Sequence, residues 1–460
     1  MSDSLTCLST RGRSPAVTIS SAIAAGLAPD GGLYVPESMP PLDVSAFDRD
    51  GSLADTAASL LAPFFAGDPL SAELPAICRE ALDFETPLRA LPQRDAFVLE
   101  LFHGPTAAFK DVGARFLAAC LRRLPRRDPR PLTILVATSG DTGAAVGAAF
   151  HGQPNIEVVI LYPDGRVSPR QAHQLGSFGG NVRTLRVQGR FDDCQRMVKA
   201  ALNDAALQSV RPLSSANSIS LGRLLPQMSY YAHAAVRWWR EHGVPLNFSV
   251  PTGNLGNALA ALWVRKLGLP VGEVHLACNA NATLPEFFGG GAYHPRDAVA
   301  TLANAMDVGA PSNFERLRWT FGNDDAKLRR ALRAGSIDDT TIRHTIAHHA
   351  SAHGEVFCPH TATAVHVLDT LRACGDGAPW AVVATAHPAK FEGVVEPLVG
   401  RPVPVPAALA AMLARPAEAE PLAAEVEALK RWLRDSSPES RNGAVSPPGH
   451  LDVHTSTHRA

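Results

Sequence analysis

The sequence lacks the features that mark several broad classes of protein. No apolar run approaches the length of a membrane-spanning helix, and the N-terminus has neither the basic segment nor the apolar core of a signal peptide. The formal net charge is only -1 at pH 7, so the composition offers no electrostatic reason to bind nucleic acid or an anionic membrane surface. We therefore expect a globular protein that binds neither a membrane nor nucleic acid.

Close pairs of cysteine are also absent. None of the seven cysteines forms a Cys-x-x-Cys pair, and they stand at positions 7, 78, 120, 194, 278, 358 and 374. An odd and dispersed set predicts reduced thiols, most of them core residues, in a cytoplasmic protein.

A convincing metal-binding motif is missing as well. His344, His348, His349 and His353 lie in an apparent helix and form two pairs spaced i, i+4, which in principle could hold zinc. The stretch lacks the glutamate that a metalloprotease helix requires, and no carboxylate base neighbours it. We therefore predict a solvent-facing, histidine-rich surface and no metal site.

Periodicity and composition divide the 460 residues into three parts, and this length allows two or three domains with substantial cores. Residues 1–90 show mostly helical patterns and are expected to form a scaffold without chemistry of its own. Residues 91–435 alternate between strand and helix patterns. Residues 436–460 are rich in Ser, Pro, Gly and His and are expected to be a disordered tail.

The alternation in the second part predicts parallel strands joined by crossover helices, and so an α/β fold. Strands are expected at residues 97–102, 132–137, 156–162, 182–187, 246–250, 274–278 and 381–384. Helical patterns begin at residue 110 and also occupy residues 144–150, 192–202 and 258–267. An apolar stripe predicts a last helix packed against the body of the protein, through Leu422, Val426, Leu429 and Leu433.

Lys110 is the first candidate for chemistry. It lies between Phe109 and Asp111 at the start of a predicted helix, shortly after a Gly-Pro turn. An apolar wall and the positive end of the helix dipole both favour the neutral amine, which is the form that Schiff-base chemistry needs. A lysine in the first turn of a helix is more often simply solvated, so this interpretation depends on the loops that follow downstream.

Two glycine-containing loops each follow a predicted strand and precede a predicted helix. They are Ser-Gly-Asp-Thr-Gly at residues 139–143 and Pro-Thr-Gly-Asn-Leu-Gly-Asn at residues 251–257. Backbone amides at a helix N-terminus point outward, so each loop can receive an anion, although each by itself can be only a tight turn. Neither has the form of a nucleotide P-loop or a dinucleotide turn. Together with Lys110 they predict a cofactor phosphate and an anionic substrate, which fits pyridoxal phosphate better than a nucleotide.

Several segments resemble threonine synthase, a family of pyridoxal-phosphate enzymes. Leu-Phe-His-Gly-Pro-Thr-Ala-Ala-Phe-Lys-Asp at residues 101–111 resembles the cofactor-lysine motif of that family. Further segments similar to it, in the family's order, lie at residues 9–12, 27–36, 137–143, 191–195, 304–316 and 384–391. Single motifs would suit other fold type II pyridoxal enzymes, but Ser-Thr-Arg-Gly at 9–12 and the long segment at 304–316 are typical of threonine synthase.

The resemblance implies a role for each motif. Lys110 would bind pyridoxal phosphate as a Schiff base and act as the catalytic base. The cofactor phosphate would bind to Gly253, Asn254, Leu255, Gly256 and Asn257, and the pyridine nitrogen would face Thr385. The substrate, through its carboxylate, would contact Ser139, Gly140, Asp141 and Thr142. Further substrate-side or closure contacts would come from Ser312, Asn313 and Arg316.

The resemblance also implies the architecture of the fold type II pyridoxal enzymes. Two αβα domains with parallel-type sheets would surround the cofactor cleft within residues 91–435, the smaller one at roughly 105–215 and the larger one from the remainder. A mainly helical N-terminal domain would precede them at residues 1–90. We expect a monomer or a homodimer.

The implied activity is that of a carbon–oxygen lyase acting on phosphates. It would convert O-phospho-L-homoserine and water to L-threonine and phosphate, the last step of threonine biosynthesis. The site would close over the substrate to keep water out until the elimination is complete. Two alternatives stay open: another pyridoxal enzyme of the same fold, such as a threonine or serine dehydratase, and a non-catalytic paralogue that keeps the cofactor fold.

Overall fold

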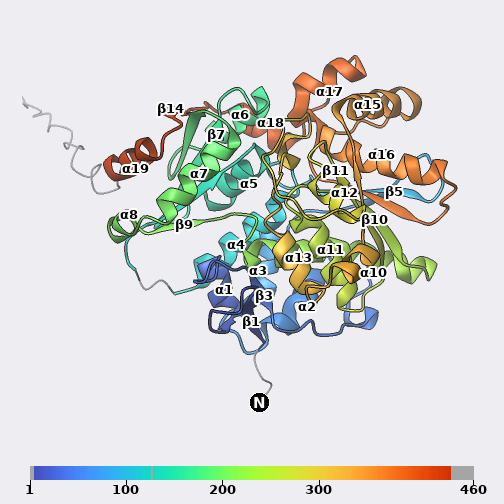
Figure 1. Ribbon diagram of the computed structural model, residues 1–460, viewed down its shortest axis with the longest axis horizontal. Helices are drawn as coiled ribbons and strands as arrows, with labels where there is room; N and C mark the ends of the chain where they lie inside the picture. The colour runs from blue at the N-terminus through green and yellow to red at the C-terminus, as the bar shows by residue number, and fades with distance from the viewer. Residues whose placement is uncertain (1–4, 126–127, 437–460) are drawn as a thin grey trace, which may run out of the picture.

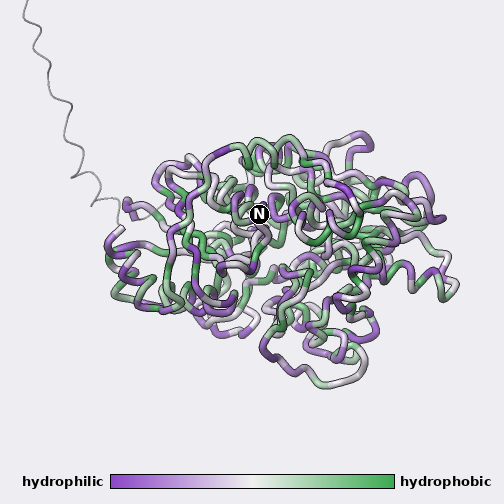
Figure 2. Tube along the Cα trace, turned by 90° about the horizontal axis from the view of Figure 1, so that it is seen from above, coloured by the Kyte–Doolittle hydropathy of each residue, from purple (hydrophilic) through white to green (hydrophobic). Residues whose placement is uncertain are grey.

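The computed structural model describes residues 5–125 and 128–436. It consists of two layered α/β units and a smaller N-terminal unit, which lies below the junction of the other two in the view of Figure 1. Hydrophobic stretches gather inside the molecule, and hydrophilic stretches lie mainly on its outside, as Figure 2 shows. The predicted α/β fold with two parallel-type sheets is therefore confirmed.

The N-terminal unit contains a small antiparallel sheet. Its strands pair in the order β2–β1–β3, with β1 (Thr6–Ser9), β2 (Val17–Thr18) and β3 (Tyr34–Pro36). Its helices are α1 (Ile19–Ala25), α2 (Leu53–Leu61) and α3 (Leu74–Ala81). The expectation of a mainly helical domain is corrected here. Strands of 2 to 4 residues are too short to show the alternation by which a strand is recognised in a sequence.

The larger sheet has six strands in the order β12–β11–β10–β13–β5–β4. They are β4 (Leu88–Ala90), β5 (Ala96–Glu100), β10 (Leu246–Pro251), β11 (Val271–Cys278), β12 (Arg333–Ser336) and β13 (Trp380–Ala384). All neighbours are parallel except β4, which runs antiparallel to β5. The helices packed on this sheet are α10 (Met228–His242), α11 (Gly256–Lys266) and α16 (Pro359–Ala373).

The smaller sheet has five parallel strands in the order β14–β8–β7–β6–β9. They are β6 (Leu132–Ala137), β7 (Ile156–Pro163), β8 (Val182–Gln188), β9 (Leu213–Ser215) and β14 (Glu420–Ala423). The helices beside it include α5 (Asp141–Phe150), α6 (Pro169–Gly176) and α7 (Phe191–Leu202). The predicted apolar stripe is wrong at Leu422, because this residue pairs with Val187 in the sheet; α19 (Val426–Asp435) begins only after it.

The remaining helices lie in the connections between these elements. They are α8 (Ala205–Val210), α9 (Leu221–Leu224), α12 (Thr283–Phe288), α13 (Phe314–Thr320), α14 (Asp325–Ala331), α15 (Asp339–His353), α17 (Glu392–Val399) and α18 (Ala407–Leu413). None of the helices in the described residues is long and apolar enough to cross a membrane. All seven cysteines are free thiols, and six of them are buried. The predicted tail, apart from Ser436, lies outside the described residues.

The histidine-rich stretch forms part of α15, as predicted, but it does not face solvent throughout. His349 is 1% exposed, and its Nε2 lies 2.8 Å from Asp369 Oδ2 on α16. The prediction of a solvent-facing surface is therefore wrong for His349, because α15 packs this face against α16. Within residues 5–125 and 128–436, no three His, Cys, Asp or Glu side chains are grouped so that they could hold a metal ion.

The helix that begins at Lys110 lies among all three units. This helix, α4 (Lys110–Arg123), packs against α3 of the N-terminal unit, against α5 of the smaller sheet and against α9. Gly113 lies at a very close approach, because a Cβ there would be 2.8 Å from the carbonyl oxygen of Arg223 in α9. Only a glycine permits the two backbones to come so near each other, so Gly113 sets the distance between α9 and the helix of Lys110.

We expect Gly113→Ala to lower the free energy of unfolding by about 1–3 kcal/mol, because the added methyl group forces α4 and α9 apart. Denaturant titration measures the change. Gly393→Ala is the matched control, since it also lies in a helix and a Cβ there would meet nothing within 4 Å. The control should be neutral or stabilise the protein by about 0.5–1 kcal/mol. Equal effects of the two substitutions would contradict this account of the helix contact.

Candidate active site

A closed turn holds Lys110 at the first position of α4. The carboxylate of Asp111 accepts hydrogen bonds from the backbone N–H of Thr106 at 2.8 Å and from its hydroxyl at 2.7 Å. Gly104 is required beside it, because a Cβ there would lie 2.5 Å from Asp111 Oδ2. Burial raises the pKa of Asp111 to about 6, although the bonds from Thr106 act in the opposite direction. The turn thereby fixes the course of the chain just before Lys110.

The amine of Lys110 loses its proton unusually easily. Burial, together with the nearby guanidinium of Arg223, lowers the pKa of Lys110 from 10.5 to about 7, while the carboxylate of Asp141 opposes the shift. Lys110 Nζ lies 4.5 Å from the centroid of the Phe109 ring. Arg223 is itself 1% exposed and donates to the carbonyl oxygen of Ala216 at 2.7 Å. At neutral pH much of Lys110 is therefore an uncharged amine, as its sequence position predicts.

Two adjoining cavities meet at Lys110. The smaller, of about 60 Å³, is lined mainly by residues 251–257 together with Thr385. The larger, of about 250 Å³, includes Ser139 and Thr142 in its lining. Both are lined by Lys110, Ser218, Asn254 and Ala305. A cavity of about 860 Å³ over α10 has no lysine in its lining, so volume alone does not identify the site.

The loop at residues 253–257 presents a helix N-terminus to the smaller cavity. It connects β10 with α11, and Leu255 at the N-cap position provides no side-chain hydrogen bond to the first amides of α11. Leu255 has a φ of +64°, a left-handed conformation that is strained for leucine. Gly253 is required because a Cβ there would be 2.8 Å from the Cα of Met306. Helix amides that have no side-chain cap are well suited to an anion such as phosphate.

Asn257 brings an unused hydrogen-bond donor to this cavity. The hydroxyls of Tyr230 and Tyr231 donate to its Oδ1, at 2.5 and 2.8 Å. The two bonds fix the orientation of the amide and leave Nδ2 buried without a hydrogen-bond partner. An unsatisfied buried donor costs about 1–3 kcal/mol. Because Asn257 lines the smaller cavity, the arrangement predicts that an acceptor binds there.

Asn254, by contrast, already uses its side chain. Its Nδ2 donates to Ser218 Oγ at 2.7 Å, and its Oδ1 accepts from the backbone N–H of Ser312 at 2.5 Å. Asn313 donates to the carbonyl oxygen of Asn254 at 3.0 Å, and Arg316 donates to Asn313 Oδ1 at 2.8 Å. Ser312, Asn313 and Arg316 thus support the loop at residues 253–257 from outside. In the described structure they line neither cavity.

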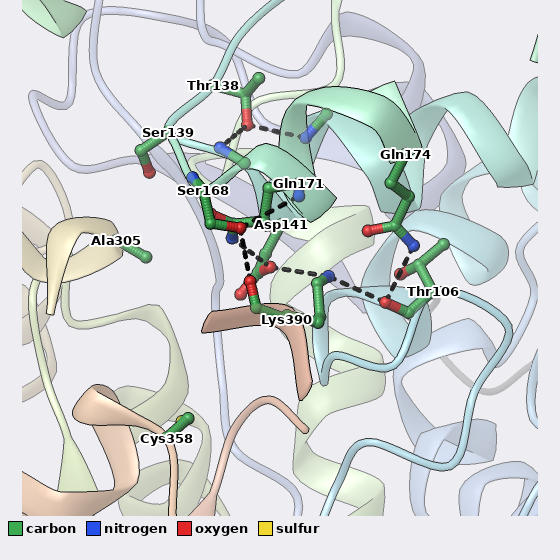
Figure 3. A network of polar contacts seen from close by, with 12 residues as sticks. Thr106, Thr138, Ser139, Asp141, Ser168, Gln171, Gln174, Ala305, Cys358 and Lys390 are labelled. Carbon is green, nitrogen blue, oxygen red and sulfur yellow. Dashed lines mark hydrogen bonds and ion pairs between the residues drawn. The ribbon is translucent and has the colours of Figure 1, made fainter. Parts of the chain in front are cut away.

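The loop at residues 139–142 lies at the N-terminus of α5. The hydroxyl of Thr138 accepts from the backbone N–H groups of Gly140 and Gly143, at 3.0 and 2.9 Å (Figure 3). Gly140 has a φ of +130°, and a Cβ there would be 2.5 Å from Gln171 Nε2, so glycine is required. Ser139 and Thr142 line the larger cavity.

Asp141 differs from its neighbours in this loop because its carboxylate is occupied. It lines the smaller cavity, but its Oδ1 accepts from Gln171 Nε2 at 3.0 Å and lies 2.7 Å from Lys390 Nζ. Figure 3 shows the carboxylate between these two side chains. Asp141 is therefore a poor direct partner for a substrate carboxylate.

Thr385 and His360 also line the smaller cavity. The carbonyl oxygen of Thr385 accepts from the backbone N–H of Phe109 at 2.9 Å, which ties the end of β13 to the turn before Lys110. His360 Nε2 accepts from the backbone N–H of Ala305 at 3.0 Å. Burial lowers the pKa of His360 to about 4, so its ring is neutral. Sequence reasoning missed His360, because it lies on α16 without any motif around it.

Further residues of the larger cavity were also missed, among them Asn217, Ser218 and Arg296. All three lie in irregular segments, where neither periodicity nor a glycine-bearing turn marks a site. Only the folding of the chain brings them to Lys110.

The chain matches three protein-family models. A model described as pyridoxal-phosphate dependent enzyme matches residues 81–389. A model of the threonine synthase N terminus matches residues 6–82, and a model of the threonine synthase C-terminal region matches residues 361–433. The three matches together extend over most of the described residues.

Whole-chain comparisons point to the same proteins. The threonine synthase of Haemophilus influenzae is 41% identical over 394 residues, which are 85% of this chain and 91% of the relative. The crystal structure of threonine synthase from Escherichia coli has a TM-score of 0.85 and 36% identity, covering 94% of this chain and 99% of the other. A pyridoxal-phosphate-bound threonine synthase from Brucella melitensis has a TM-score of 0.85 and 36% identity, covering 95% and 100%.

We expect Lys110 in ligand-free protein to react with acetic anhydride at half its maximal rate near pH 7, because only the uncharged amine reacts. Peptide mass spectrometry over a pH series measures the rate. Lys327, whose side chain is 65% exposed, serves as the internal reference. A half-maximum near the pH expected for an ordinary lysine, about 10.4, would show that the amine is solvated.

Proposed function

This chain belongs to the threonine synthase family of pyridoxal-phosphate-dependent enzymes, and we propose from this premise that Lys110 and the two loops form its catalytic site. The activity is that of a threonine synthase, a pyridoxal-phosphate-dependent lyase. In full, the proposed reaction converts O-phospho-L-homoserine and water to L-threonine and phosphate. The observation that carries the proposal is a lysine with a pKa of about 7 that borders two cavities, each reached by the loop before a helix.

The residues of the smaller cavity fit pyridoxal phosphate. The buried Nδ2 of Asn257 lacks a partner, and the amides at the start of α11 lack a side-chain cap, so both suit a phosphate group. The proposed phosphate site comprises Gly253, Asn254, Leu255, Gly256 and Asn257. Thr385 would face the pyridine nitrogen, where a hydroxyl, unlike a carboxylate, would not hold the ring protonated. When bound, the cofactor supplies an electron sink for negative charge that develops on the substrate.

Lys110 would hold the cofactor covalently at first and move protons with its Nζ once the substrate has replaced it. A pKa of about 7 makes the amine both a competent base and a competent acid at neutral pH. Lys110 would remove a proton from the substrate Cα and then one from Cβ, and it would return protons in the later steps. A flexible side chain at the first position of a helix can reach both carbons of one bound molecule in turn.

The larger cavity is proposed to bind the substrate. Ser139 and Thr142 would contact the substrate carboxylate directly, while Gly140 and Asp141 would shape the loop. Among the described residues that line this cavity, Arg296 is the cation other than Lys110, and we assign the substrate phosphate to it. Arg296 pairs with Glu286 at 2.7 Å, but with 45% of its side chain exposed this pair is weak and a phosphate can replace it.

Ser312, Asn313 and Arg316 would act on the substrate only indirectly in this proposal. Their hydrogen bonds hold the backbone and side chain of Asn254, so they support the loop that binds the cofactor phosphate. Their motif suggested substrate-side or closure contacts; the role proposed here is instead support for the loop at residues 253–257.

The division of the chain stays a prediction. We retain residues 1–90 as the N-terminal domain and residues 91–435 as the catalytic region, and we add β14 to the smaller subdomain of residues 105–215 because it pairs with β8. A monomer or homodimer in the cytoplasm is also still a prediction. The seven free thiols support a reducing compartment.

Borohydride reduction of the protein with bound pyridoxal phosphate should place the pyridoxyl group on Lys110, because Lys110 lines both cavities. Peptide mass spectrometry locates the group. Lys110→Ala should lose both the adduct and the formation of threonine and phosphate from O-phospho-L-homoserine. An adduct on Lys390 or Lys266 would contradict the assignment of Lys110. The absence of phosphate release from the wild-type protein would favour a dehydratase of the same fold.

The two loops can be told apart by a pair of substitutions. Asn257→Ala should weaken cofactor retention roughly ten- to a hundredfold, since a hydrogen bond to a charged group is worth about 1.5–3 kcal/mol. Thr142→Val should leave cofactor occupancy near the wild-type value and lower kcat/KM by a comparable factor. Occupancy after dialysis and steady-state kinetics at saturating cofactor are the measurements. The opposite pattern would mean that the loops have been assigned the wrong way round.

A further inference from the structure

Lys390 is a second buried lysine near Lys110, and the proposed reaction does not use it. It is 1% exposed and lies in the short 3-10 helix η5 (Pro388–Phe391), which follows β13 of the larger sheet. Its Nζ lies 2.7 Å from Asp141 Oδ1 and donates to the carbonyl oxygen of Thr106 at 2.8 Å (Figure 3). One ammonium group thereby joins the end of the larger sheet, the substrate loop and the turn that positions Lys110.

The segment around Lys390 is also fixed to the smaller sheet along its backbone. Ser168 donates to the carbonyl oxygen of Lys390 at 2.5 Å, and Arg170 donates to the carbonyl oxygen of Ala389 at 2.8 Å. Arg170 further pairs with Glu396 in α17 at 3.0 Å. These bonds connect α6 of the smaller sheet with η5 and α17 of the larger one. They hold the Lys390 side chain where Asp141 is within reach.

Asp141 stays ionised although it is buried. Burial alone would raise the pKa of Asp141, but the ammonium of Lys390 and the amide of Gln171 outweigh it and hold this pKa below the ordinary value. The same carboxylate acts on Lys110, whose pKa it raises. In the part of the chain that the structure describes, the ion pair of Asp141 is with Lys390.

We propose that Lys390 is a positioning residue that binds and neutralises Asp141, so that this carboxylate supports the substrate loop without forming an ion pair with Lys110. An ion pair between Asp141 and Lys110 would hold Lys110 as an ammonium, which can neither attach to the cofactor nor accept a proton. With Lys390 in place, Asp141 Oδ1 is taken by an ammonium and an amide. The inference rests on the proposed role of Lys110 and adds a condition for it.

Other charged or titratable groups near Lys110 lie on α4, α9 and α16, and Asp192, Arg296, Asp297 and Asp307 line the larger cavity together with it. Arg223 on α9 lowers the pKa of Lys110. Asp111 on α4 is bonded to Thr106. His360 on α16 stays neutral, because burial lowers its pKa to about 4. The charges of Asp141 and Lys390 can therefore be removed by substitution, singly or together, without changing the other charged groups near Lys110.

The pH at which acetylation of Lys110 reaches half its maximal rate in ligand-free protein tests the proposal. Lys390→Met should raise this midpoint by about one to three pH units, because Asp141 then stabilises the Lys110 ammonium. Asp141→Asn should lower it, because the carboxylate that raises the pKa of Lys110 is then gone. The double variant should lose the rise seen in Lys390→Met and lie at or below the wild-type midpoint, because its cause, the free Asp141 carboxylate, is gone. Lys390→Arg, which keeps the charge, should stay near the wild-type midpoint.

A purely structural role of Lys390 would change stability without moving the two single variants in opposite directions. Unchanged midpoints in Lys390→Met and Asp141→Asn, or a double variant whose midpoint stays as high as that of Lys390→Met, would overturn the proposal. If Lys390→Met does not fold, the midpoints of Asp141→Asn and of the double variant can still be compared. The double variant removes both charges of the pair, so it leaves no buried charge of this pair without a partner.

This readout does not depend on catalysis. A pyridoxyl adduct on another lysine would refute the proposed function, while the acetylation midpoints would still show whether Lys390 neutralises Asp141. An adduct on Lys110 together with unmoved midpoints would refute only the role of Lys390.

Discussion

The structure depends on keeping the amine of one lysine uncharged in a cleft that must also bind anions. Burial disfavours an ammonium at Lys110, and the guanidinium of Arg223 disfavours it further. The buried cations near Lys110 are bonded to other groups: Arg223 to a carbonyl oxygen, and Lys390 to a carboxylate and a carbonyl oxygen. The two needs are compatible in the proposed site because the anions would bind to the amides at the start of α11, to Asn257 and to Arg296, so that no ammonium is needed at Lys110.

The fold brings the necessary parts together at the carboxyl ends of parallel strands. Lys110 begins α4, Asp141 begins α5 and Gly256 begins α11, and these helices follow β5, β6 and β10. In open α/β sheets ligands bind beyond the carboxyl ends of the strands, where helix N-termini also point. Since β6 belongs to one sheet and β10 to the other, each sheet contributes one of the two loops that are proposed to bind anions. The site therefore exists only while the two sheets keep their relative placement, which the contacts of η5 and α17 with α6 help to fix.

Long, patterned elements could be predicted from the sequence, and short ones could not. β6 has the predicted bounds and α4 begins at Lys110, whereas β9 and β14 have only 3 and 4 residues and are defined by partners distant in the chain. The site follows the same rule. Ser139, Thr142 and Asn257 lie in continuous loops that were recognised, while His360 and Arg296 reach the cleft only through tertiary folding. Asp141 shows most clearly what the sequence cannot predict. Its loop was predicted, but its ion pair with Lys390 forms only because one sheet packs against the other.

The N-terminal unit has a physical connection to the loop assigned to the cofactor phosphate. Arg316 on α13 donates to the carbonyl oxygen of Tyr34 in β3 at 2.9 Å, and its other bond is to Asn313, which holds the backbone of Asn254. Thr10 donates to Glu315 on the same helix at 2.6 Å. The segment at residues 9–12, which resembles a family motif, is thus bonded to the helix that supports the loop. A motif far from Lys110 can be typical of one family for this reason: its hydrogen bonds hold the helix that supports the loop assigned to the cofactor phosphate.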